Sequence, residues 1–207
     1  MVLGMTAVGR YIALEGTEGC GKSTHAARLA VALDAVLTRE TGGTHIGTEI
    51  RSLLHDPANT HLGDKAEALL IAADRAQHFH ELLRPALALG RHVVSDRSAY
   101  SSLAYQGYGR GLELDEVRQI SNWATGGLWP ELVILIDVPI EVLVERMATR
   151  DLDRFEQADD AFHSRVRAGF AAMAAADPRH WVVVDGTRSK DEVAHDIRSA
   201  TLDRLGI

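Results

Sequence analysis

Short apolar runs alternate along the chain with longer stretches in which apolar residues recur every three or four positions. The runs at 11–14, 35–38, 92–96, 132–138 and 181–184 predict strands, and 132–138 is the most strongly apolar of them. The periodic stretches predict helices over 23–34, 46–54, 64–83, 115–124 and 140–149, a helix that ends at 176, and a helix over 190–205. This alternation predicts an α/β fold in which a parallel sheet carries helices on both faces.

Glycine and proline indicate where these elements stop. Two glycines after a charged pair predict that 39–44 is a loop. Pro57 should end the helix predicted over 46–54. We expect Pro85 to kink the 64–83 helix or to lie near its end, and Gly90 to terminate it. The stretch 99–108 is polar and aromatic, and we expect the glycines at 107, 109 and 111 to break it.

The first predicted strand runs into a glycine-rich turn with the spacing G-x-x-x-x-G-K-[ST] from Gly16 to Ser23. Glycines leave backbone N–H groups accessible to a polyphosphate, and the following helix adds its positive N-terminal end. Lys22 can reach the β- and γ-phosphates, and the Ser23 hydroxyl can bind Mg²⁺. The loop predicts nucleoside triphosphate binding by Gly16, Thr17, Glu18, Gly19, Cys20, Gly21, Lys22, Ser23 and Thr24. By itself it leaves a kinase, an NTPase motor and a GTP switch open.

Composition narrows the class of protein. A length of 207 residues, 46% of them hydrophobic, predicts a single domain over 1–207. The net charge of −7 argues against a nucleic-acid partner and favours small substrates. Cys20 is the only cysteine, so an intramolecular disulfide and a cysteine-based zinc site are excluded, and a reducing cytoplasm fits. Because no apolar run is long enough to span a membrane, we expect a soluble cytoplasmic protein.

Charged residues recur after the predicted strands and on helices near the same edge of the sheet. Asp96 and Arg97 end the third predicted strand, where side chains of a parallel sheet line the ligand crevice. Several arginines converging on two phosphate-bearing ligands would suit phosphoryl transfer, which depends on positioning and charge neutralisation. The charged residues in this set are Arg39, Glu40, Arg51, Arg75, Asp96, Arg97, Arg146, Arg150 and Arg154.

The charged run 150–156 has the character of a mobile lid whose arginines act on the transferring group, with a simple flexible loop as the alternative. The type of acceptor decides which further groups a kinase needs. A phosphate monoester is already ionised near neutral pH and needs no general base, whereas a nucleoside hydroxyl needs a carboxylate to take its proton. Both kinds of kinase stay open on this reasoning.

Five motifs together resemble one family. They are E-G-x-E-G-x-G-K-S-T at 15–24, T-R-E-x-G-G-T at 38–44, I-R-x-L-L at 50–54, D-R followed by S-x-x-A-Y-Q-G-x-G-R-G at 96–111, and L-D-R-x-E at 152–156. In this order, over nearly the whole chain, they are similar to the bacterial type of thymidylate kinase. The resemblance implies a P-loop NTPase fold with a five-stranded parallel sheet and a short lid, usually in a homodimer. It also implies Mg²⁺-dependent transfer from ATP to dTMP, giving ADP and dTDP for dTTP synthesis.

The resemblance also implies roles for individual residues. Lys22 and Ser23 would serve the ATP phosphates and Mg²⁺, with Asp96 near the metal and the transferring group. Glu18 would lie beside the acceptor sugar and phosphate, and the lid arginines Arg150 and Arg154 would assist catalysis. The acceptor site would comprise Arg51 and Arg97 at the phosphate, Arg75 at the thymine, Ser101, Tyr105 and Gln106 around the nucleoside, and Arg39, Glu40 and Ile71.

Three positions depart from the family pattern. Ile71 stands where the family usually has the phenylalanine that stacks on thymine, so an aromatic stacking contribution is absent. Thr41 replaces the usual proline, and Ser98 replaces the usual tyrosine or histidine. These departures leave phosphoryl transfer intact and bear on base specificity. A related nucleotide or deoxynucleoside kinase with another acceptor, or a non-catalytic nucleotide-binding switch, remains the alternative, although a guanine-reading N-K-x-D sequence is absent.

Overall fold

The computed structural model describes residues 9–147 and 153–207. Its strands are β1 (Tyr11–Glu15), β2 (Val36–Arg39), β3 (Val93–Asp96), β4 (Leu132–Asp137) and β5 (Trp181–Asp185). They form one sheet in the order β2-β3-β1-β4-β5, and every pair of neighbours is parallel. The prediction of a five-stranded parallel sheet is therefore confirmed.

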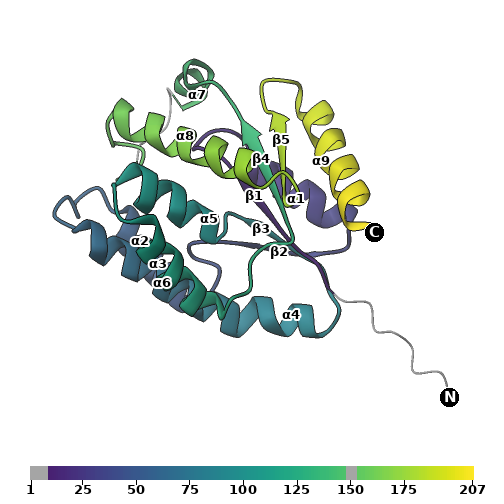
Figure 1. Ribbon diagram of the computed structural model, residues 1–207, viewed down its shortest axis with the longest axis horizontal. Coiled ribbons are helices and arrows are strands. Elements are labelled where there is room, and N and C mark those ends of the chain that lie inside the picture. The colour runs from purple at the N-terminus through teal and green to yellow at the C-terminus, as the bar shows by residue number, and fades with distance from the viewer. Residues whose placement is uncertain (1–8, 148–152) are drawn as a thin grey trace.

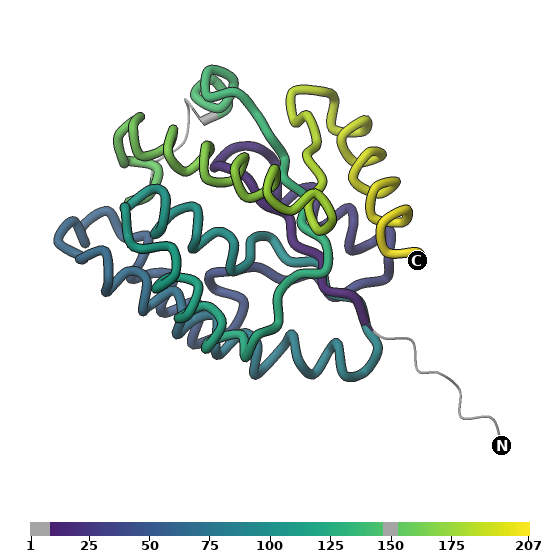
Figure 2. Tube along the Cα trace, viewed as in Figure 1, coloured from purple at the N-terminus to yellow at the C-terminus, as the bar shows by residue number. Residues whose placement is uncertain are grey.

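Helices cover both faces of this sheet (Figure 1). The helical elements are α1 (Lys22–Ala32), α2 (His45–His55), α3 (Asp64–His78), η1 (Phe79–Leu83), α4 (Arg84–Ala88), α5 (Ala99–Ser102), η2 (Leu103–Gly109), α6 (Leu114–Thr125), α7 (Ile140–Met147), α8 (Asp160–Ala176) and α9 (Lys190–Leu205). The tube view shows α9 returning along the sheet to lie against α1 (Figure 2). Among the described residues, no helix is both long enough and apolar enough to cross a membrane.

The core is divided by the sheet. On one face, Leu29 of α1, Leu143 of α7 and Ile197 of α9 pack on strand residues such as Ile134. On the other face, residues of α2, α3, η2, α6 and α8 pack on Val133, Leu135 and Trp181. Because β1 and β4 are central and buried along nearly their whole length, the apolar runs of the sequence correspond to strands covered on both sides.

The long helix expected over 64–83 forms and contains a π-helical turn. The α-helix ends at His78, the π-helical turn covers Phe79–Leu83, and helical dihedral angles continue through Leu83 and Arg84 into α4. Pro85, which has no N–H to donate to the preceding turn, therefore follows directly on this wider turn. Gly90, with φ 73°, follows the end of α4, as its position in the sequence predicts.

The expectation that glycines break the 99–108 stretch is wrong for Gly107, which lies inside η2, the continuation of the helix that begins at Ala99. Gly109 is the last residue of η2. A Cβ at Gly109 would come within 2.6 Å of Phe162, and one at Gly107 within 2.5 Å of Leu114. These glycines therefore allow close packing against neighbouring elements. Gly111, with φ 77°, lies beyond the end of η2.

Candidate active site

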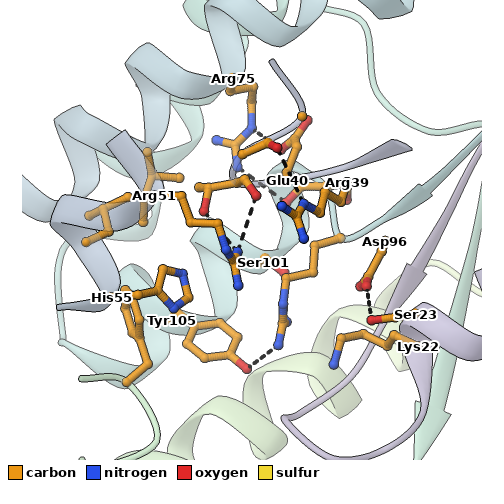
Figure 3. Close-up of a pocket in the computed structure, with 18 of the residues that line it drawn as sticks. Lys22, Ser23, Arg39, Glu40, Arg51, His55, Arg75, Asp96, Ser101 and Tyr105 are labelled. Carbon is orange, nitrogen blue, oxygen red and sulfur yellow. Dashed lines mark hydrogen bonds and ion pairs between the residues drawn. The ribbon is translucent and has the colours of Figure 1, made fainter. Parts of the chain in front are cut away.

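A cavity of about 560 Å³ opens at the carboxyl edge of the sheet. Its wall combines the phosphate loop, the loop after β2, α2, α3, the segment after β3, and residues 153, 155 and 156. The predicted site residues at the wall are Glu18, Gly19, Lys22, Ser23, Arg39, Glu40, Arg51, Ile71, Arg75, Asp96, Arg97, Ser101, Tyr105 and Gln106. Arg39, Arg51 and Tyr105 extend into the same space, with Lys22 and Ser23 beside Asp96 (Figure 3).

The remaining predicted residues divide into four groups. Arg146 of α7 donates to the Gly186 carbonyl oxygen at 3.0 Å and does not form part of the cavity wall. Gly16, Thr17, Cys20, Gly21 and Thr24 belong to the phosphate loop or the start of α1 without forming the cavity wall. Arg154 is described, and it borders the wall without forming part of it. Arg150, and with it the first part of the predicted lid 150–156, lies outside the described residues.

The phosphate loop has a backbone that glycine alone permits at Gly16. Gly16 has φ 138°, and a Cβ there would come within 2.6 Å of the Ile136 carbonyl oxygen. Lys22 begins α1, and its Nζ donates to the Thr17 carbonyl oxygen at 2.7 Å. The ammonium group thus folds over its own loop, at the positive end of α1, where an anionic phosphate group can bind.

Ser23 and Asp96 bring two oxygen donors together across the sheet edge. The Ser23 hydroxyl, at the start of α1, donates to Oδ2 of Asp96, the last residue of β3. A hydroxyl and a carboxylate are hard ligands of the kind that Mg²⁺ prefers, and Mg²⁺ commonly takes its other ligands from phosphates and water. The residues present therefore fit the metal that the sequence predicts at Ser23 and Asp96.

Arg97 connects the phosphate loop to the segment after β3. Its Nη2 donates to Glu18 Oε1 at 2.9 Å and to the Tyr105 hydroxyl at 3.1 Å, and its Nη1 donates to the Gly16 carbonyl at 3.1 Å. Tyr105 also donates to Glu18 Oε1 at 2.5 Å. Burial alone would raise the pKa of Glu18, but Arg97, Lys22 and the Tyr105 hydrogen bond outweigh it and lower the pKa. Glu18 is therefore held as a carboxylate.

Glu15 is a buried carboxyl group behind the cavity wall, and its contacts with two wall residues were not predicted from the sequence. Its Oε1 accepts from the Ser98 N–H at 2.8 Å and from the Ser98 hydroxyl at 2.7 Å, and its Oε2 accepts from the Ser101 hydroxyl at 2.6 Å. Burial raises the pKa of Glu15, against the opposing effects of Arg97 and these hydrogen bonds. A carboxylate at the end of an otherwise apolar strand was the available signal.

Arg75 is completely committed to protein partners. The side chain is 1% exposed, and its Nε donates to Glu40 Oε2 at 2.8 Å. Its Nη2 donates to the Ser98 carbonyl at 3.3 Å and to the Ser102 hydroxyl at 3.1 Å. Arg75 and Ile71 both belong to α3 and both reach the cavity wall, so the structure brings together the two positions predicted to contact the acceptor base.

Arg39 and Arg51 add positive charge to the cavity wall. Burial, followed by repulsion from Arg39 and Arg97, lowers the pKa of Arg51, and the attraction of Asp153 and Asp96 opposes this only in part. Within residues 9–147 and 153–207, no ion pair involves Arg39 or Arg51. The neighbouring carboxylates are engaged in the pairs Glu40–Arg75, Glu18–Arg97 and Asp153–His55. A cavity with this charge arrangement favours a polyanionic ligand.

The end of the predicted lid is fixed to the acceptor side of the cavity. Arg154 Nε donates to the Leu54 carbonyl at 2.7 Å, and its Nη2 donates to Glu67 Oε2 at 2.7 Å. The structure thus places Arg154 against α2 and α3 and not at the phosphate loop, and its catalytic role stays a prediction. Asp153 pairs with His55 at 2.6 Å, and Phe155 forms part of the cavity wall. Sequence reasoning missed Glu67, His55 and Phe155.

Comparison with known proteins places these features in one family. The family model described as thymidylate kinase matches residues 14–197. A thymidylate kinase of Deinococcus radiodurans is 48% identical over an alignment of 202 residues that covers 95% of this chain and 98% of that protein. One of Nitratidesulfovibrio vulgaris is 45% identical over an alignment of 203 residues that covers 92% of this chain and 94% of that protein. A crystal structure of thymidylate kinase from Ehrlichia chaffeensis has a TM-score of 0.76 at 28% identity, covering 93% of this chain and 98% of that one. With the motifs, the sheet order and the phosphate-loop cavity in agreement with these matches, the chain belongs to the thymidylate kinase family.

Proposed function

We propose that this enzyme transfers the γ-phosphoryl group of ATP to dTMP, giving ADP and dTDP. The observation that carries the proposal is that Arg39 and Arg51, which form no ion pair among the described residues, line a cavity that also contains the phosphate loop and Arg97. Two phosphate-bearing ligands meet in such a cavity only if their mutual repulsion is neutralised. The name of the relatives and this charge pattern both indicate a nucleoside monophosphate kinase.

Each charged group has a place in this reaction. Lys22 and the N–H groups of the phosphate loop bind the ATP phosphates, while Arg51 and Arg97 bind the phosphate of dTMP. The acceptor oxygen belongs to an ionised phosphate, so the reaction needs no residue to remove a proton. This fits Glu18, whose lowered pKa and contacts with Arg97 and Tyr105 suit it to orientation of the acceptor.

Ser23 and Asp96 are the residues that would hold Mg²⁺. The bound ion would neutralise phosphate charge during transfer. Arg150, and Arg154 when released from Glu67, would act on the transferring group from the lid 150–156, within a single domain over 1–207. These roles are part of the proposal.

A different acceptor base is the second candidate, because Ile71 stands at the position expected to stack on thymine. The deciding experiment is a coupled ADP-release assay with ATP and Mg²⁺ across dTMP, dUMP, dCMP, dGMP, UMP and thymidine, with Lys22→Ala as the control. Strong preference for dTMP supports the proposal. Preference for another monophosphate reassigns the pocket around Ile71 and Ser98, and absence of transfer to every acceptor contradicts the kinase function.

We also propose that the enzyme is a homodimer. Two large apolar side chains on helices that pack together, Leu69 of α3 and Trp123 of α6, are 58% and 86% exposed. The helices α2, α3 and α6 lie side by side in Figure 1. Burial of such side chains against a second copy would remove apolar area from water. Light scattering should give twice the monomer mass, and Trp123→Asp should give the monomer; a wild-type monomer at micromolar concentration would contradict the proposal.

A further inference from the structure

Asp74 of α3 is a buried carboxyl group that the proposed reaction does not use. The side chain is 0% exposed, and its Oδ1 accepts a hydrogen bond from the Gly42 N–H at 2.9 Å. Its other oxygen, Oδ2, has no hydrogen-bond partner among the described residues. A buried carboxyl group with one oxygen lacking a hydrogen bond lowers the free energy of unfolding, so such a group commonly has a functional reason.

The bond to Gly42 fixes the loop after β2 at its sharpest point. Gly42 has φ 89°, a conformation that other L-residues rarely adopt. A Cβ at Gly42 would come within 2.8 Å of Arg51 Cδ, so the Arg51 side chain lies directly on the Gly42 backbone. Arg51 Nη1 then donates to the Thr41 carbonyl at 3.2 Å. Asp74 thus holds the two loop residues on which the Arg51 side chain rests.

Asp74 also contacts the start of the helix that carries Arg51. A Cβ at Gly47, in the first turn of α2, would come within 2.3 Å of Asp74 Oδ1. The carboxyl group therefore lies between the loop and α2. Asp74 therefore contacts both the loop on which the Arg51 side chain rests and the helix that carries Arg51.

The groups around Asp74 form a charged layer between α3 and the loop. Arg75 pairs with Glu40 at 2.8 Å, and His78 lies 3.3 Å from Glu40 and 2.6 Å from the Thr38 hydroxyl. Burial, with Glu40 adding repulsion and the Gly42 hydrogen bond opposing, raises the pKa of Asp74 to about 6. Arg75 and His78 both contact Glu40, while Asp74 is the member of this layer that accepts from the Gly42 N–H.

We propose that Asp74 is a positioning residue for the acceptor phosphate site: it fixes the loop 39–44 and through it sets the place of the Arg51 guanidinium. This inference rests on the proposed function, in which Arg51 binds the acceptor phosphate. It assigns to Asp74 no contact with substrate. Its effect should therefore appear in acceptor binding and should disappear when Arg51 is removed.

The matched variants are Asp74→Ala and Asp74→Asn. Alanine removes the acceptor of the Gly42 N–H, and asparagine keeps an oxygen in the same place. Losing a buried hydrogen-bond partner corresponds to about a tenfold change in an equilibrium constant such as a dissociation constant. We expect Asp74→Ala to raise the KM for dTMP by about that factor, with kcat and the KM for ATP changed less than about twofold. Asp74→Asn should restore the KM for dTMP to near the wild-type value.

The double variant tests the route through Arg51. Arg51→Ala alone should raise the KM for dTMP, and adding Asp74→Ala to it should raise this KM no further. Additive effects, or equal losses for the alanine and asparagine variants, would overturn the inference while leaving the kinase assignment intact. An unchanged KM in Arg51→Ala would overturn both the role of Arg51 and this inference. If Asp74→Ala does not fold, Asp74→Leu, with a similar shape and no buried charge, carries the same expectation.

Discussion

Nη2 of Arg97 lies 2.9 Å from Oε1 of Glu18, so one ion pair joins the end of β3 to the phosphate loop. The pair connects the segment proposed to bind the acceptor with the segment proposed to bind ATP. Arg97 also has φ 74°, a backbone conformation that is rare for a residue with a side chain. The two halves of the cavity therefore share a residue whose backbone and side chain are both fixed.

Replacement of Arg97 by alanine should raise the KM for dTMP and lower kcat/KM. The fall in kcat/KM should correspond to a loss of about 2–5 kcal/mol of transition-state stabilisation. The loss has two sources, because the acceptor phosphate loses a ligand and Glu18 is left buried without its partner. Steady-state kinetics at varied dTMP and saturating ATP measures the effect. Unchanged acceptor kinetics would remove Arg97 from the acceptor site.

Replacement of Ile71 by phenylalanine should lower the KM for dTMP. An aromatic side chain at the cavity wall adds a stacking contribution of about 0.5–1.5 kcal/mol, which corresponds to roughly a two- to tenfold change. Ile71→Leu, which adds no ring, is the matched control and should leave the KM within about twofold. A phenylalanine variant with a higher KM than the leucine variant would show that the base does not lie against this position.

Comparison of two single variants, Arg154→Ala and Glu67→Gln, distinguishes a structural from a catalytic role of Arg154. Glu67 is fully buried and accepts from Arg154 at 2.7 Å and from Arg110 at 3.1 Å, so loss of Arg154 should lower the free energy of unfolding by about 1–3 kcal/mol. Denaturant unfolding measures this change. If Arg154 acts only as an anchor, both variants should have similar kcat; a much lower kcat for Arg154→Ala would support the predicted catalytic role.

Asp74 should make the protein less stable as the pH rises. Its pKa of about 6 in the folded protein exceeds the ordinary value of 3.8, so the folded state binds more protons between these values. The free energy of unfolding should therefore fall by about 3 kcal/mol as the pH rises from about 4 to about 6, and the loss should persist above that window. The melting temperature of Asp74→Asn relative to wild type should increase between pH 4.5 and pH 7.5. A difference that does not change with pH would contradict this prediction.

The sequence predicts the parts of the site that depend on local spacing. Gly16, Lys22 and Ser23 are determined by the phosphate-loop pattern, and Asp96 and Arg97 by their place at the end of a strand. In a parallel sheet these strand ends must share one edge, and the neighbouring positions of β1 and β3 satisfy that rule. The α/β class and the phosphate-loop edge of the cavity therefore follow from pattern alone, whereas the acceptor side was expected from the family resemblance.

Features that depend on contacts between distant segments were not predictable in this way. The positions of Arg154 and Asp74 are determined by Glu67 and Gly42, each of which is far away in the sequence. The roles of Gly107 and Gly109 depend on which side chains pack opposite them, and a single sequence carries no direct signal of that packing. The same glycines that indicate a loop in the sequence indicate a tight helix contact in the structure.

The tight contact between η2 and α8 depends on glycines in both helices. Gly109 faces Phe162 and Val166, and Gly169 faces Tyr108, so the two helices approach closely on both sides. A side chain larger than hydrogen at Gly109 or Gly169 would therefore push η2 and α8 apart. Tyr105 belongs to η2, so such a substitution would also move the hydroxyl that donates to Glu18 in the phosphate loop.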